Sequence, residues 1–416
     1  MNKTLVLIFS IVFLISCNSK ETKTDIVQSD FDFAASQLTY AMSETEKGIA
    51  EESPESKEKR EKKGRGPLVS PRSIDEQGKL ILVPSRDWTS GFFPGELWYM
   101  YEYTKDSKWE KAAREYTARI EAEKTNGGTH DMGFKVYCSF GNGYRLTKDE
   151  QYKEILMESA YTLTTRYKPN IKAIRSWDHS RDKWECPVII DNMMNLELLF
   201  WAFRESKDSV FYNVAVNHAN TTIQNHFRDD YSSYHVIDYD TITGKVLKKN
   251  THQGYAHESA WSRGQAWAIY GYTMCYRETQ KPEYLEQAKH VANYIFTHTN
   301  LPEDLIPYWD YNAPEIPNEP RDVSAATVTA SALYELSLYD KENADKYKKW
   351  ADTILENLST DNYLAKAGSD YGFLLLHSTG SKPGKFEVDV PLSYADYYFL
   401  EALLRKQKLE QTGNIF

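Results

Sequence analysis

Cysteine is scarce in this sequence, and its placement argues against two kinds of small site. Only four cysteines occur among 416 residues. No two of them form a Cys-x-x-Cys pair or stand at ligand spacing from a histidine. A disulfide framework and a zinc site are therefore not expected, and no metal or cofactor is predicted. Cys138, Cys186 and Cys275 are expected to be free buried thiols.

Basic residues are not in excess either. The chain has 60 acidic and 50 basic side chains, and its formal net charge is −10. This balance argues against a nucleic-acid partner, which would require a basic face. Long hydrophobic runs are missing after the first seventeen residues, and no low-complexity segment divides the chain. What is abundant is aromatic side chains, at 14% of the residues, which can fill a large helical core or present flat faces to sugars.

The first seventeen residues, MNKTLVLIFSIVFLISC, resemble a bacterial lipoprotein signal. A lysine gives a positive start, an apolar run too short to span a membrane follows, and Leu-Ile-Ser-Cys17 matches a cleavage box. We therefore expect acylation at Cys17, a polar tether over residues 18–30, and a lipid-anchored protein in the periplasm or on the outer-membrane surface. An ordinary secretory signal and a chance apolar start are the alternatives.

Apolar residues recur every three to four positions along most of the chain, which is typical of amphipathic helices. Similar aromatic–polar segments close several of these stretches, and a second helical stretch follows each one. Their irregular separations fit helical hairpins with short turns on one side and variable loops on the other. We therefore expect residues 31–416 to form one all-α domain, a closed ring of hairpins whose variable loops carry the site. The aromatic–polar segments are Tyr101–Asp106, Tyr144–Asp149, Phe203–Asp208 and Tyr276–Lys281, and the expected helices cover Trp98–Tyr103, Lys108–Ala122, Gln151–Arg166, Leu196–Arg204, Tyr284–Phe296, Ala325–Leu338, Ala344–Leu358 and Tyr394–Lys406.

One long segment does not follow this pattern. Residues 43–87 are charged, rich in proline and glycine, and show little periodicity. Such a segment inside a compact domain is usually functional or disordered. We expect Ser53–Gly66 to be solvated, and Pro67–Asp87 to fold over the site because it leads directly into an aromatic motif.

Two clusters near the start of the expected ring combine aromatic and acidic side chains. In Asp87-Trp-Thr-Ser-Gly-Phe-Phe-Pro-Gly95, Trp88 and Phe92 could form a stacking platform, or they could pack a helix entrance. In Thr129-His130-Asp131, the carboxylate follows a glycine pair and precedes a helix. Asp131 therefore serves either chemistry or simple helix capping.

A third cluster places Asp191 in an apolar run, Pro187-Val-Ile-Ile-Asp191-Asn-Met-Met. A carboxyl group there either caps a helix or sits desolvated. Desolvation raises a carboxyl pKa, and a second carboxylate nearby raises it further. This is how an acid stays protonated near neutral pH. Trp177 lies a short distance upstream, in Arg175-Ser-Trp-Asp-His179.

The fourth cluster is histidine- and tryptophan-rich and covers residues 251–267. Arg263 and Trp267 are four apart and therefore share one helical face. A guanidinium beside an indole could grip a carboxylate while the ring stacks on a sugar. The alternative is a surface arginine lying over a core tryptophan. His252 and His257 lack the spacing of a metal-binding helical pair, which again argues against a metal.

At these clusters the sequence resembles the unsaturated glucuronyl hydrolases, glycoside hydrolase family 88. The matching pieces occur in family order between Trp88 and Arg405: WTSGFFPGELW, HDMGF, IIDNMMNL, THQGY with SAWSRGQAW, and EVDVPLSYADYYFLEALLR. The resemblance implies an (α/α)6 barrel, in agreement with the expected hairpins. It also implies an activity that hydrates the double bond of a terminal 4,5-unsaturated uronate in oligosaccharides made by polysaccharide lyases.

The resemblance also implies roles for individual residues. Asp191 matches the family's proton donor, and Asp131 matches a second aspartate that helps to keep the donor protonated. Arg263 is our candidate for the uronate carboxylate, and His252 is expected to share the wall formed by Gln253. The substrate contacts implied by the match are Trp88, Phe92, His130, Trp177, His235, Gln253, Arg263 and Trp267.

The segment His377–Lys385 precedes the last motif, and some family members use a serine/lysine loop here to bind a sulfate. Ser378, Ser381 and Lys382 could do so in this chain, although a solvated Gly/Pro turn explains the segment equally well. Two other functions remain open. One is an inverting glycosidase with Asp131 as base and Asp191 as acid. The other is a non-catalytic glycan-binding lipoprotein.

Overall fold

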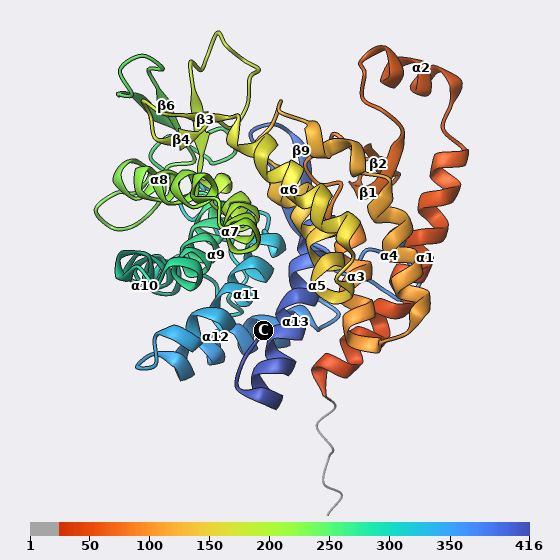
Figure 1. Ribbon diagram of the computed structural model, residues 1–416. Helices are drawn as coiled ribbons and strands as arrows, with labels where there is room; N and C mark the ends of the chain where they lie inside the picture. The colour runs from red at the N-terminus through yellow and green to blue at the C-terminus, as the bar shows by residue number, and fades with distance from the viewer. Residues whose placement is uncertain (1–24) are drawn as a thin grey trace, which may run out of the picture.

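The computed structural model describes residues 25–416, and within them the chain forms a closed double ring of helices (Figure 1). The predicted signal, Cys17 and residues 18–24 of the predicted tether lie outside the described residues. An inner ring is closed by contacts between neighbouring helices and between its last and first members. Its members are α3 (Phe92–Thr104), η2 (Gly133–Gly141) continued by α5 (Asn142–Thr147), α7 (Leu196–Ser206), α9 (Ser262–Thr279), α11 (Val323–Tyr339) and α13 (Ser393–Thr412).

The outer ring packs against the inner one, so each inner helix has an outer neighbour. Outer helices carry a single buried stripe, whereas the first halves of α9, α11 and α13 are buried on all sides. A helix that is apolar all round belongs in a core, and an amphipathic one covers it. The outer helices are α1 (Ile26–Ala50), α4 (Ser107–Ala118), α6 (Glu150–Thr164), α8 (Ser209–His226), α10 (Pro282–Thr297) and α12 (Ala344–Leu358). The predicted (α/α)6 barrel is therefore confirmed.

The repeated aromatic–polar segments are the short turns between inner and outer helices. Each inner helix of the first four hairpins ends at a residue in the left-handed conformation, with φ of 57°, 56°, 61° and 56°. In the first three, an aspartate follows and its side chain accepts a hydrogen bond from the backbone two residues later. This is the usual way to cap the next helix. The left-handed residues are Lys105, Lys148, Lys207 and Gln280.

The opposite end of the ring carries long loops and short strands, gathered at the top of Figure 1. They form a three-stranded antiparallel sheet, β5–β6–β7, with Val188 paired to Ile237, and antiparallel pairs β1–β2, β3–β4 and β8–β9. At this end the inner helices begin. The strands are β1 (Leu68–Ile74), β2 (Leu80–Pro84), β3 (Tyr167–Lys168), β4 (Ala173–Ile174), β5 (Pro187–Ile189), β6 (Val236–Tyr239), β7 (Val246–Asn250), β8 (Ser378–Ser381) and β9 (Phe386–Val390).

The eight helices expected from periodicity are all present, with ends shifted by a few residues. Two boundaries differ from expectation. Helix α1 begins at Ile26, inside the predicted tether, because Asp25 caps it and Val27 packs into the core. Residues 43–87 are also more regular than expected. They hold the end of α1, the exposed helix α2 (Pro54–Lys62), in which no residue is buried, and the β1–β2 hairpin.

None of the helices within residues 25–416 combines the length and apolar character that crossing a membrane requires.

Candidate active site

The predicted catalytic side chains lie at one end of the barrel, where the inner helices begin. Asp131 lies two residues before η2, and Asp191 lies in η3 (Ile190–Asn195), a 3-10 turn that leads into α7. The two segments are locked together. A Cβ on Gly133 would lie 2.6 Å from the Cα of Asn195, and the Asn195 side-chain oxygen accepts a 3.2 Å hydrogen bond from the backbone N–H of Phe134. Only glycine allows so close an approach of the two backbones.

Asp191 is a buried carboxyl group without a hydrogen-bond partner on Oδ2. Its side chain keeps 14% exposure, and Oδ2 lies 3.6 Å from Nε2 of His235. Burial raises the pKa of Asp191 to about 7; the charge of Asp131 adds to the rise, whereas Arg263 opposes it. A protonated acid is therefore available near neutral pH. The helix-capping alternative is wrong, since no side chain caps η3.

Asp131 is held by its own neighbours and remains 19% exposed. Its Oδ2 accepts a 2.6 Å hydrogen bond from the Thr129 hydroxyl, and Oδ1 lies 3.2 Å from Nε2 of His130. It does not cap η2 with its side chain. The carboxylate is thus fixed in orientation and open to a ligand.

The tautomer of His235 follows from its hydrogen bonds. Its Nδ1 accepts from the backbone N–H groups of His252 and Gln253, both at 3.1 Å. The hydrogen therefore sits on Nε2, which faces Asp191. Burial holds the pKa of His235 well below its usual value, so the ring is neutral. Sequence reasoning named His235 only through the family resemblance, because β6 is distant from the other motifs.

An aromatic wall lines the open side of the site. Trp177 is half-buried and stacks on His179, with ring centroids 5.4 Å apart. His252 is exposed, and its ring lies 5.8 Å from that of Trp177. Trp88 is half-buried and packs on Tyr394 at 4.9 Å. These three predicted contacts lie where a flat ligand could reach them.

Two predicted stacking residues lie instead in the core. Phe92 is fully buried and packs on Tyr394 and Tyr397, and Trp267 is fully buried between Phe134 and Tyr398. Their faces are not open in this structure, because both residues belong to inner helices that are packed on all sides, and their contact with a sugar stays a prediction. The indole N–H of Trp267 makes no hydrogen bond of normal geometry, but it lies close enough to the Asp191 carboxyl group to lower its pKa.

Arg263 is also enclosed, at 1% side-chain exposure. Its guanidinium pairs with Asp322 and donates to the backbone carbonyls of Thr379 at 2.7 Å and Gly380 at 2.6 Å. The predicted grip on a substrate carboxylate has no support here, since both terminal nitrogens are occupied. Arg263 instead holds strand β8, and the Gln253 amide donates to the same Gly380 carbonyl at 3.1 Å.

The three predicted sulfate-binding side chains do not converge on open space. The Ser378 hydroxyl is buried and accepts from the backbone of Ser324, and that of buried Ser381 accepts from Gly384. Lys382 is paired with Glu319. Ser378 and Ser381 face the protein because β8 lies directly over the start of α11, and their role toward a sulfate stays a prediction; Lys382 alone remains partly exposed.

Buried polar atoms without a partner are uncommon in folded proteins, and several belong to the predicted site residues or to the matching motifs. Besides Asp191 and Trp267 they include the Tyr394 hydroxyl and the Asn192 amide oxygen, two residues that sequence reasoning did not single out although both lie inside the matching motifs. No cluster of His, Cys, Asp and Glu within residues 25–416 could hold a metal ion. At the predicted site residues and at Asn192 and Tyr394, the atoms without partners are His130 Nδ1, Trp177 Nε1, Asp191 Oδ2, Asn192 Oδ1, His235 Nε2, Trp267 Nε1 and Tyr394 Oη, and further such atoms lie elsewhere in the described residues.

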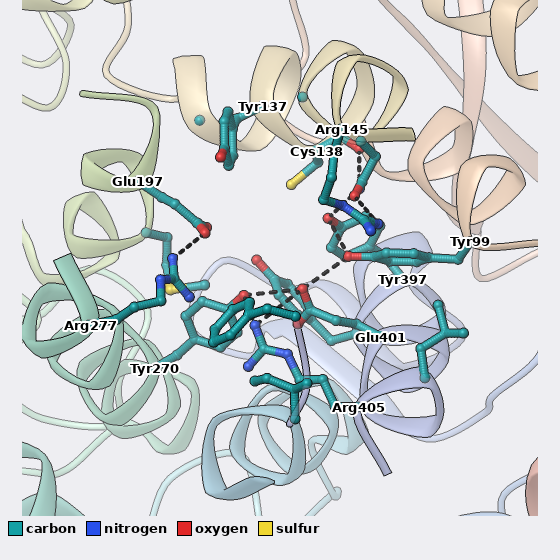
Figure 2. A pocket seen from close by; sticks show the side chains of 18 of the residues that line it. Tyr99, Tyr137, Cys138, Arg145, Glu197, Tyr270, Arg277, Tyr397, Glu401 and Arg405 are labelled. Carbon is teal, nitrogen blue, oxygen red and sulfur yellow. Dashed lines mark hydrogen bonds and ion pairs between the residues drawn. The ribbon is translucent and has the colours of Figure 1, made fainter. Parts of the chain in front are cut away.

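A cavity of about 580 Å³ lies inside the barrel among the inner helices, and its lining extends from Gly133, Phe134 and Met194 to Leu404 and Lys408 near the end of α13. Figure 2 shows that its charged groups face one another: Arg277 pairs with Glu197, and Glu401 accepts hydrogen bonds from Tyr99 and Tyr270. Its lining does not include Asp131 or Asp191. Asp131 and Asp191 therefore lie outside this cavity, at the loop-covered end of the barrel.

Comparison with known proteins identifies the family. No family model matches the chain. An unsaturated glucuronyl hydrolase of Formosa agariphila is 54% identical over 341 residues, which are 82% of this chain and 85% of that protein. An unsaturated chondroitin disaccharide hydrolase of Streptococcus agalactiae is 34% identical and covers 79% of this chain and 83% of its own. The crystal structure of an unsaturated glucuronyl hydrolase specific for heparin has a TM-score of 0.85 at 45% identity, over 93% of this chain and 98% of that chain. With its barrel and its paired aspartates, the chain belongs to the unsaturated glucuronyl hydrolases.

Proposed function

We propose that this chain removes the terminal 4,5-unsaturated uronate from lyase-generated oligosaccharides by hydrating the C4–C5 double bond, with Asp191 as proton donor. The observation that carries the proposal is the state of Asp191. It is a buried acid with a pKa near 7, one unpaired oxygen, a neutral histidine on one side and the Asp131 charge nearby. A group whose pKa lies close to the working pH is suited to give and take a proton.

The reaction needs one acid that later acts as a base. The Asp191 proton goes to C4, and the electron pair of the double bond forms the new C–H bond. A cation stabilised by the ring oxygen develops at C5, where the Asp131 carboxylate would offset its charge. Water then adds at C5 and returns a proton to Asp191. The resulting hemiketal opens, releasing the remaining sugar and an α-keto acid.

The surrounding residues would orient the sugar and keep Asp191 in place. Trp88 and Trp177 offer apolar faces of the kind that pack on sugar rings. The Nε2–H of His235 points toward Asp191 and would steady its carboxyl group. His130 would fix Asp131 in the same way.

A preference for sulfated substrates remains a prediction, and Lys382 is the side chain that could provide it. Replacing Lys382 with alanine should lower kcat/KM on a sulfated disaccharide by about tenfold, the value of one charge-assisted contact, and leave the unsulfated one unchanged. An unaltered activity ratio between the two substrates would end this idea.

We also propose that Cys17 is acylated and that the enzyme is anchored in the cell envelope. The lipoprotein-like signal supports this, and the well-capped start of α1 shortly afterwards leaves a short linker to a membrane. Labelling with a radioactive fatty acid should mark the wild type and not Cys17→Ser. Equal labelling of both would exclude the anchor.

One assay tests the activity. The enol-ether absorbance of an unsaturated disaccharide should disappear with the wild type, while a saturated disaccharide should stay intact. Cleavage of the saturated sugar would favour an inverting glycosidase, and tight binding without turnover of either would favour a glycan-binding role. The Asp191→Asn variant should bind the unsaturated disaccharide but should not turn it over.

A further inference from the structure

Two β-hairpins from opposite ends of the chain meet beside the site. β1 of the N-terminal hairpin lies against β9 of the C-terminal one, and the Ser73 hydroxyl donates to the carbonyl of Pro391 at 2.8 Å. The C-terminal hairpin also includes β8, whose carbonyls hold Arg263 and Gln253. Whatever fixes this hairpin therefore also fixes part of the site.

Arg72 of β1 joins the two hairpins to the aromatic motif. Its guanidinium forms a bidentate pair with Glu387 of β9, with Nη2 at 2.9 Å from Oε2. Nη1 reaches both carboxylate oxygens of Asp87, at 3.0 and 2.8 Å. Asp87 in turn accepts from the backbone N–H and hydroxyl of Thr89, on either side of Trp88. We call Arg72, Asp87 and Glu387 the Arg72 clamp.

The side-chain pattern of β9 cannot be explained by burial of apolar surface. Glu387 points inward with 5% of its side chain exposed, while its neighbours Phe386 and Val388 are 48% and 36% exposed. A strand oriented by its hydrophobic residues would bury Phe386 and Val388 and expose Glu387. The orientation of β9 is thus set by the pairing of Glu387 with Arg72.

The backbone of this hairpin is unusual too. Lys385, Glu387 and Asp389 have φ of 54°, 53° and 57°, and His377 at its base has 64°. Residues other than glycine rarely adopt this conformation, and they keep it only where surrounding contacts hold them. A buried ion pair adds little net stability, but it can fix a geometry.

We propose that Arg72 is a positioning residue for substrate binding, which acts by clamping the β8–β9 hairpin and the Trp88 segment into the rim of the site. This inference rests on the proposed function. The bidentate fork matters as well as the charge, because lysine cannot bridge two carboxylates in the same plane. The rim then receives the sugar, and Glu387 also lies close enough to Arg263 to contribute to its raised pKa.

The test compares Arg72→Met, Arg72→Lys and Glu387→Gln with the control Arg119→Met. Arg119, which follows the last residue of outer helix α4, also bridges two carboxylates, those of Glu46 and Glu115. The substrate is the unsaturated disaccharide that the wild type turns over fastest. We expect KM to rise about tenfold in Arg72→Met and Glu387→Gln, since small displacements of binding groups have effects of this size. The KM of Arg72→Lys should lie between those of the wild type and Arg72→Met, and the KM of the control Arg119→Met should equal that of the wild type.

A purely structural role would have another signature. Loss of folded protein lowers the apparent kcat and the melting temperature and leaves KM unchanged. The double variant Arg72→Met/Glu387→Gln should have a KM no higher than the worse single variant, because both changes break one contact. A KM within twofold of the wild type in Arg72→Met, or multiplied effects in the double variant, would overturn the proposal.

A binding measurement separates this inference from the proposed function. In an Asp191→Asn background, the Kd for the same disaccharide should rise about tenfold on adding Arg72→Met. Where no disaccharide is turned over, the Kd is measured for the unsaturated disaccharide that binds most tightly. If the wild type turns over no unsaturated disaccharide, the proposed function fails, and this Kd still decides the role of Arg72. An unchanged Kd overturns the clamp alone.

Discussion

At the scale of single residues, the proposed chemistry depends on one proton that burial keeps on the Asp191 carboxyl group. Asp191 is surrounded by inner-helix side chains, and its burial outweighs the nearby positive charge of Arg263. That positive charge is itself neutralised by Asp322. The barrel end therefore keeps a cation close to the substrate without forcing Asp191 to ionise.

The pH dependence of the reaction follows from this proton. Because Asp191 must be protonated to act and its pKa lies at about 7, kcat/KM should fall tenfold per pH unit above neutrality. Initial rates of absorbance loss between pH 5 and 9 measure this. A profile that is flat to pH 9 would exclude Asp191 as the donor.

The same burial should destabilise the folded protein. The folded-state pKa lies above the ordinary 3.8, so the destabilisation is absent at pH below 3.8 and complete above about 7. Asp191→Asn should therefore raise the free energy of unfolding at pH 8 by up to about 4 kcal/mol, with less gain as the pH falls. Urea unfolding at pH 5 and pH 8 measures the difference. An equal effect at both values would contradict the assigned pKa.

At the scale of elements, close packing between two short helices sets the distance between the aspartates. Neither η2, a π-helix, nor η3, a 3-10 turn, has the regular α-helical spacing. Departures of this kind are frequent at functional sites. They let Asp131 and Asp191 stand just outside regular helix, where their side chains are not used as caps.

Gly133 tests this packing. In Gly133→Ala the new methyl group would meet the Asn195 backbone at 2.6 Å, a distance that requires the segments to separate. We expect a loss of about 1–3 kcal/mol in stability and a fall in kcat/KM of tenfold or more. Gly127→Ala is the control, because its nearest neighbour is 3.5 Å away. Equal kinetics for the two variants would show that the contact is unimportant.

At the scale of the whole molecule, the two ends of the barrel have different tasks. The loop end holds polar atoms without partners, whereas the charges in the cavity at the other end are paired with one another. Arg277 contacts Glu197, Glu278 and Glu335 from three inner helices and so links them. We interpret this end as structural.

Removing that link should separate stability from activity. Arg277→Met leaves three carboxylates without their shared cation and should lower the free energy of unfolding by about 3–5 kcal/mol. Since Arg277 lies at the far end of the barrel, KM at a temperature where the variant is folded should be unchanged. Thermal unfolding and steady-state kinetics together check this, and a raised KM would show that the two ends are coupled.

The sequence by itself determined the helices, the hairpin turns and the two aspartates. Periodic apolar residues indicate which face of a helix is buried, and capping residues such as Asp106 and Asp149 indicate where helices begin. Both signals act over a few residues, so they can be read without the fold. The regular start of α1 was missed because its buried stripe begins within polar sequence and includes the polar residues Asp30 and Gln37.

Only the tertiary structure decided how the remaining polar and aromatic residues are used. Phe92 and Trp267 have the composition of a sugar-binding wall, yet ring closure buries them. Arg263 has the chemistry to bind a carboxylate, yet its guanidinium already donates hydrogen bonds to backbone carbonyls of strand β8, which is distant in sequence. The partners of Arg72 lie 15 and 315 residues away. Such contacts depend on chain closure, which no local pattern encodes.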